Sequence, residues 1–137
     1  MNYSAYTSAL QEQISVHQGL LNQLADKDYL SLLERTAAER SLQIIIEALI
    51  GASKHLNRKL ELPARNDAYS SVQQLADNNS IDPKQLPMIK GAIGMRNAIV
   101  HDYLNLDWEV IGAVIQAKKY SLLVQVVDRL CKGLKHK

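Results

Sequence analysis

The segment from residue 28 to residue 58 constrains the fold most, because apolar residues fall on nearly every side of a helix with this sequence. Leucine, isoleucine and alanine recur at three- and four-residue steps, and between residues 42 and 50 they widen beyond a single stripe. A helix that is apolar almost all round lies at the centre of a bundle or packs against two partners at once. The segment therefore predicts a long central helix with the remaining elements around it.

Apolar spacing predicts further amphipathic helices on both sides of this segment. They cover residues 4–24, a short stretch after residue 67, a stretch that starts near Pro87, and the stretch from Trp108 to about Leu130. Pro87 would kink a helix that began at Asp82, so residues 82–86 are predicted to form a separate turn. No segment is convincing as a strand. The expected fold class is all-α, with four to five helices in a single domain that covers residues 1–137.

Composition and charge limit the kinds of protein to consider. The formal net charge is +2, which is too small to indicate a nucleic-acid-binding protein by electrostatics alone. Cys131 is the single cysteine, which excludes an intramolecular disulfide and a cysteine-based zinc site. No leader opens the chain and no apolar run reaches about 18 residues. We therefore expect a cytoplasmic protein that neither spans a membrane nor is exported.

A cluster of polar functional groups is set into the apolar stretch from Gly91 to Tyr103. Its members are Arg96, Asn97, His101, Asp102 and Tyr103. Histidine takes or gives a proton near neutral pH, and arginine presents planar donors that suit a phosphate. These two groups suffice for metal-free cleavage of RNA, in which a base activates the ribose 2′-hydroxyl and a cation stabilises the charge on the phosphorane. The chain lacks the acidic cluster typical of a magnesium site, so we expect no metal and no cofactor.

The spacing within this cluster does not by itself build a site. Asn97 and His101 are four residues apart and share a helix face, whereas Arg96 and His101 are five apart and lie roughly 140° around the helix. Either the arginine reaches round, or the helix ends or loosens near His101, or a second subunit completes the site. The residues alone also allow a purely structural interpretation, in which His101 caps the helix and Arg96 pairs with Glu47 or another acid.

The segment from Arg96 to Tyr103, preceded by Gly94-Met95, resembles the R-x-x-x-x-H-x-Y signature of HepT-like toxins in the HEPN superfamily. The likeness covers most of residues 28–130 and is strongest from 65 to 106. It implies a dimeric HEPN-type bundle in which the motif helices of two subunits line a shared cleft. It also implies metal-independent endoribonuclease activity. In that interpretation His101 is the base and Arg96 grips the phosphate, while Asn97 and Asp102 support the active site.

The resemblance further implies partners and a mode of regulation. Members of the family are usually paired, in type VII toxin–antitoxin systems, with an MntA-like nucleotidyltransferase antitoxin that attaches AMP to the tyrosine of the motif, here Tyr103. The expected partners are therefore an RNA substrate, this antitoxin and a second copy of the chain. Gly91, Gly94 and the apolar excess of the central helix also favour a homodimer. A second hypothesis stays open: a non-catalytic helical partner of a nucleotidyltransferase that uses the same cleft only to bind a nucleotide or a protein.

Overall fold

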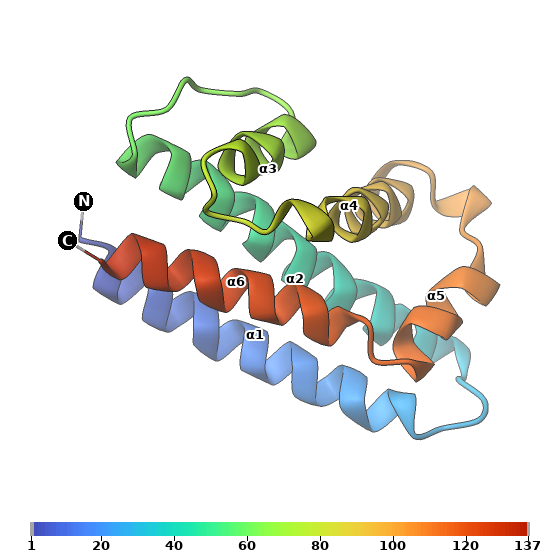
Figure 1. Cartoon of the computed structure of the whole chain (residues 1–137). Helices are drawn as coiled ribbons and strands as arrows, with labels where there is room; N and C mark the ends of the chain where they lie inside the picture. The colour runs from blue at the N-terminus through green and yellow to red at the C-terminus, as the bar shows by residue number, and fades with distance from the viewer. Residues whose placement is uncertain (1, 137) are drawn as a thin grey trace.

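The computed structural model describes residues 2–136, which are helical apart from their connecting turns (Figure 1). The helices are α1 (Tyr3–Ala25), α2 (Leu32–Lys59), α3 (Ala68–Asp77), α4 (Leu86–His101), α5 (Trp108–Gln116) and α6 (Tyr120–Lys135), with short 3-10 turns η1 (Pro83–Gln85) and η2 (Tyr103–Asn105). No strand occurs in this described part of the chain. The predicted all-α class is confirmed.

Helix α2 lies at the centre of the bundle and contacts α1, α3, α4 and α6. A capping box starts it, because the Ser31 hydroxyl accepts the backbone N–H of Glu34 at 3.1 Å and the Glu34 carboxylate accepts that of Ser31 at 2.9 Å. Its buried residues are spread over several faces, as the sequence predicted. Since the chain's own helices cover those faces, the apolar excess of α2 does not by itself argue for a second subunit.

Four of the other helices form two groups around α2 (Figure 1). Helices α1 and α6 pack against each other and along α2, whereas α3 and α4 pack together on another side of it. The start of α1 and the end of α6 lie close together (Figure 1). There the Lys59 ammonium donates to the carbonyls of Gly133 at 2.8 Å and Leu134 at 3.1 Å. The packing of α3 and α4 on α2 places the motif helix, α4, beside the middle of α2, the longest helix of the molecule.

Two prolines set the start of α4. The Asp82 carboxylate accepts the backbone N–H of Lys84 at 3.0 Å and caps η1, in which Pro83 takes the first position. Pro87 then falls within the first turn of α4, where its missing N–H leaves no hydrogen bond unmade. The predicted separate turn before the motif helix is therefore confirmed.

The prediction of one helix from Trp108 to about Leu130 is wrong. The chain turns after Gln116, where Lys118 adopts a left-handed conformation with φ 54° and the Lys119 N–H reaches back to the Val114 carbonyl at 3.0 Å. The pieces on either side, α5 and α6, are bent by 68°. No single helix in residues 2–136 is long and apolar enough to cross a membrane, and α5 with α6 reaches that length and composition only as this bent pair.

Helix α5 is fastened to α2 by a polar contact close to the motif. The Trp108 indole N–H donates to the buried Glu39 carboxylate at 2.8 Å, and the Arg35 guanidinium lies 5.1 Å from the centre of the Trp108 ring. A buried carboxylate that accepts a hydrogen bond is far less costly than one without a partner. This contact anchors the start of α5, the helix that follows the motif and η2 in the chain.

Candidate functional site

A groove of about 620 Å³ lies between α2, the beginning of α3 and α4. Helix α2 contributes Glu47, Ile50, Gly51 and Lys54, the α3 region contributes Asn66, Asp67, Ala68 and Tyr69, and α4 contributes Ile93, Arg96 and Asn97. The residues from α2 and α4 are spaced by three and four, so each set forms one stripe along its helix. The groove combines an apolar floor with cations, carboxylates, amides and a phenol, which is the composition of a ligand site.

Arg96 enters this groove from the inner side of α4. It follows the buried Ile93 by one helical turn, and its Nε atom is buried without a hydrogen-bond partner among the described residues. A buried N–H that lacks an acceptor costs free energy. The guanidinium also makes no ion pair within residues 2–136, which leaves its planar donors available to an anion in the groove. The alternative pairing of Arg96 with Glu47 is not formed, and the Glu47 carboxylate instead accepts the Gln43 amide at 3.2 Å.

His101 lies elsewhere on the same helix. It is the last residue of α4, it is exposed, and it is not among the residues that line the groove. Helix α4 runs unbroken from Leu86, so the two motif residues keep the roughly 140° separation of a regular helix. A loosened helix between Arg96 and His101 is thus excluded, and the groove of one chain brings Arg96 together with Asn97 but not with His101.

Asp102 and Tyr103 form the turn that follows the motif helix. Asp102 ends α4, its backbone N–H donates to the Ala98 carbonyl at 3.0 Å, and its carboxylate accepts the Asn105 amide at 2.6 Å. Tyr103 begins η2 and is 53% exposed. The Asp102 carboxylate therefore holds the turn that presents Tyr103 to solvent.

The outer face of α4 is open along its whole length. Lys90, Gly94, Asn97 and His101 follow one another at steps of four, three and four, and all four are exposed. A methyl group added at Gly94 would meet no atom within 4 Å in the described structure. Beyond the helix end, Leu104 is 97% exposed. An uncovered strip that carries a histidine of the motif and ends in an apolar side chain has the character of an interaction surface.

Sequence reasoning missed two groove residues, Lys54 and Tyr69. The stripe of Glu47, Ile50, Gly51 and Lys54 is visible as helical spacing, but nothing in the sequence indicates that the start of α3 and the inner side of α4 face it.

The carboxyl group of Asp67 accepts the Ser70 N–H at 2.9 Å, and hydrogen bonds from Ser70, with a smaller contribution from Lys54, hold the pKa of Asp67 below its usual value. Asp67 therefore stays ionised at neutral pH at this end of the groove.

The family described as Ribonuclease HepT-like matches residues 10–130. The chain belongs to the HepT-like family. Its relatives include the mRNA nuclease HepT of Shewanella oneidensis, 34% identical over 76 residues that cover 56% of this chain and 57% of the relative. The tRNA nuclease HepT of Aphanizomenon flos-aquae is 28% identical over 104 residues, which cover 74% and 71% of the two chains. The chain thus spans little more than half the length of the Shewanella relative.

Solved structures share the HepT-like fold. The tri-AMPylated Shewanella oneidensis HEPN toxin, in complex with MNT antitoxin, superposes with a TM-score of 0.77 at 23% identity and covers 89% of this chain and 96% of that one. YutE of Bacillus subtilis, a cytosolic protein of unknown function, gives a TM-score of 0.71 at 18% identity, with 90% and 86% covered. These likenesses establish a HEPN-type helical fold.

Proposed function

We propose that this HepT-like chain is the toxin of a type VII toxin–antitoxin pair and acts as a metal-independent endoribonuclease. The observation that carries the proposal is the Arg96 guanidinium, which lines a groove on the motif helix and makes no ion pair within residues 2–136. A phosphodiester supplies the anionic acceptor that this donor lacks. Among residues 2–136, no group of three or more His, Cys, Asp or Glu side chains is arranged to hold a metal ion.

The proposed reaction uses two groups of the motif. His101 takes the proton of a ribose 2′-hydroxyl, and that oxygen attacks the adjacent phosphorus. The bond from phosphorus to the 5′-oxygen then breaks, the leaving oxygen takes up a proton, and the products are a 2′,3′-cyclic phosphate and a 5′-hydroxyl. Arg96 stabilises the negative charge on the phosphoryl oxygens as they approach the transition state, and the Asn97 amide supports the same phosphate. Asp102 contributes by fixing the end of α4 that carries the histidine.

A second copy of the chain completes this site. Arg96 enters the groove from the inner side of α4, whereas His101 lies on the open outer face, so one chain presents the two groups in different directions. Gly94 leaves room on the outer face for another helix to approach closely. In an isologous dimer, the partner's motif helix would supply the His101 that the groove of one chain lacks.

RNA cleavage by the purified chain is expected to proceed undiminished in excess EDTA and to leave a 2′,3′-cyclic phosphate. The reason is that the base, His101, and the cation, Arg96, are both side chains, so no step of the proposed reaction requires a metal ion. Incubation of a labelled single-stranded RNA with and without EDTA, followed by mass spectrometry of the product ends, checks both points. Cleavage that appears only with added metal, or products that end in a 3′-hydroxyl, would exclude the mechanism.

Inhibition is proposed to act through Tyr103 and a nucleotidyltransferase antitoxin of the MntA type. The Tyr103 side chain is exposed on a turn that the Asp102–Asn105 hydrogen bond holds, so its hydroxyl is accessible to an enzyme. The solved Shewanella relative carries AMP groups and is bound to such an antitoxin. On this chain, AMP would add a negative phosphate and a bulky nucleoside two residues beyond His101, where both compete with the RNA.

Coexpression of the wild-type chain with its cognate nucleotidyltransferase is expected to raise the mass of the chain by one or more AMP groups and to abolish its toxicity. Tyr103→Phe should gain no AMP and should stay toxic, because the aromatic ring is retained and only the acceptor hydroxyl is lost. Intact-protein mass spectrometry and growth after induction measure the two effects. A wild-type chain that is silenced without any gain in mass would show that the antitoxin acts by covering the site instead.

A further inference from the structure

We infer that Lys54 and Tyr69, neither of which belongs to the R-x-x-x-x-H-x-Y motif, form a subsite for single-stranded RNA beside Arg96. In this subsite Lys54 binds the phosphate next to the one that is cleaved, and Tyr69 supports the base between them. The inference rests on the proposed ribonuclease function and names the part of the chain that holds the substrate strand in place.

Two cations from different helices face the same groove. Lys54 is exposed at the end of the α2 stripe, and Arg96 comes from α4 on the opposite wall. Neither makes an ion pair within residues 2–136. A single cation suits one phosphate, whereas two cations along one groove suit a strand that carries successive phosphates.

The carboxylates of the groove leave these cations available. The Glu47 carboxylate accepts the Gln43 amide at 3.2 Å, and the Asp67 carboxylate accepts the Ser70 N–H at 2.9 Å, so each is bonded to its own helix. Lys54 is nevertheless close enough to Asp67 to contribute to the lowered pKa of that carboxyl group. Lys54 and Asp67 line the same groove, which Arg96 enters from another helix, α4.

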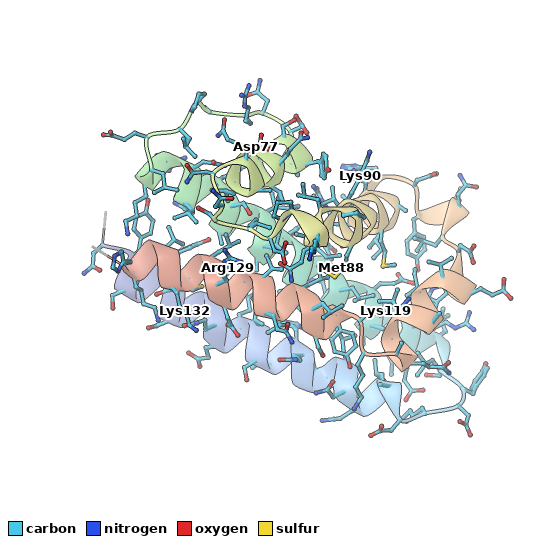
Figure 2. The ribbon with its side chains drawn as sticks, in the orientation of Figure 1. Asp77, Met88, Lys90, Lys119, Arg129 and Lys132 are labelled. Atoms are coloured by element: carbon cyan, nitrogen blue, oxygen red, sulfur yellow. The ribbon has the colours of Figure 1, made fainter. Side chains whose placement is uncertain are left out.

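Tyr69 supplies an aromatic surface at the edge of the groove. Its ring is half-buried in the first turn of α3, and the Lys90 ammonium of α4 lies 5.3 Å from the ring centre (Lys90 is labelled in Figure 2). That cation–π contact ties the ring to α4 and fixes its orientation at little further entropic cost. Aromatic side chains beside cations are the usual support for unpaired RNA bases, and the Asn66 amide, which lines the same groove, offers a donor and an acceptor to a base edge.

The test measures binding of an RNA oligonucleotide whose 2′-hydroxyls are all methylated, so that the nucleophile is blocked and binding is separated from cleavage. Fluorescence anisotropy at several KCl concentrations gives the slope of log affinity against log salt. Lys54→Ala is expected to reduce this slope by about 0.7, the value for one lost phosphate contact on a single strand. Lys132→Ala removes the same charge from the exposed side of α6, away from Lys90 in the view of Figure 2, and should leave the slope unchanged.

A second pair of variants tests the base contact. Tyr69→Leu is expected to weaken RNA binding by about 10-fold, because a stacking surface is lost, whereas Tyr69→Phe keeps the ring and should bind like the wild type. The inference is overturned if Lys54→Ala and Lys132→Ala change the slope equally, or if Tyr69→Leu binds as tightly as Tyr69→Phe. Should Tyr69→Leu fail to fold, the lysine pair decides alone, because both lysines are exposed.

The same experiment separates this inference from the proposed function. If wild-type protein does not cleave unmodified RNA but Lys54→Ala still lowers the slope selectively, the subsite stands and the ribonuclease proposal falls. If wild-type protein cleaves RNA and the two lysine variants behave alike, the ribonuclease proposal stands and the subsite falls.

Discussion

Replacing His101 with alanine is expected to slow RNA cleavage by about 10²- to 10⁴-fold, the range that a general base contributes. RNA binding should change little, because the groove that holds Arg96 does not include His101. The stability of the fold should also be preserved, since the side chain is exposed at the last position of α4. Single-turnover cleavage rates, with binding measured on 2′-O-methyl RNA, separate these effects.

His136→Ala is the matched control for this experiment. It removes another exposed histidine, at the C-terminal cap of α6, and leaves intact the backbone carbonyl that Lys59 contacts. Its cleavage rate should equal that of the wild type. A His101→Ala protein that cleaves at the wild-type rate would mean that the base lies elsewhere. If the wild-type protein itself does not cleave RNA, the result favours the non-catalytic partner of a nucleotidyltransferase.

The architecture follows from signals that act over short distances in the sequence. The central position of α2 follows from apolar residues on nearly all its faces, and the start of α4 follows from the positions of Pro83 and Pro87. The break between α5 and α6 carries no such signal, because Lys118 takes the left-handed conformation usually left to glycine or asparagine. It is stabilised instead by packing, since α5 contacts α1 while α6 lies along α2.

The site was predictable only where it lies on one helix. Regular helix geometry places Arg96 and His101 roughly 140° apart, and the unbroken α4 keeps them so. The groove itself needs three elements that are separated by turns in the sequence, and only the packing of α3 and α4 on α2 brings Lys54, Tyr69 and Arg96 together. Sequence spacing describes the stripe on each helix but not which stripes face one another.

Mixing two inactive variants, Arg96→Met and His101→Ala, is expected to restore about a quarter of wild-type cleavage if the site is shared between two copies. Random exchange makes half of the dimers mixed, and in each mixed dimer the intact arginine of one copy meets the intact histidine of the other at one of the two sites. Methionine keeps the apolar stem of Arg96 packed and removes the buried N–H that lacks a partner, so this variant should fold.

The exchange is followed by native mass spectrometry on differently tagged chains, and cleavage is measured on the same mixture. Each variant alone should show less than about one hundredth of the wild-type rate, so recovery to a quarter is a large effect. If mixed dimers form and cleavage does not return, Arg96 and His101 of the same chain act on the same phosphate, and the arginine reaches round its own helix. If the chain stays monomeric at micromolar concentration, the shared cleft is excluded. Recovery, in contrast, requires that His101 of one copy reaches the groove that holds Arg96 of the other, because that groove contains no His101 of its own chain.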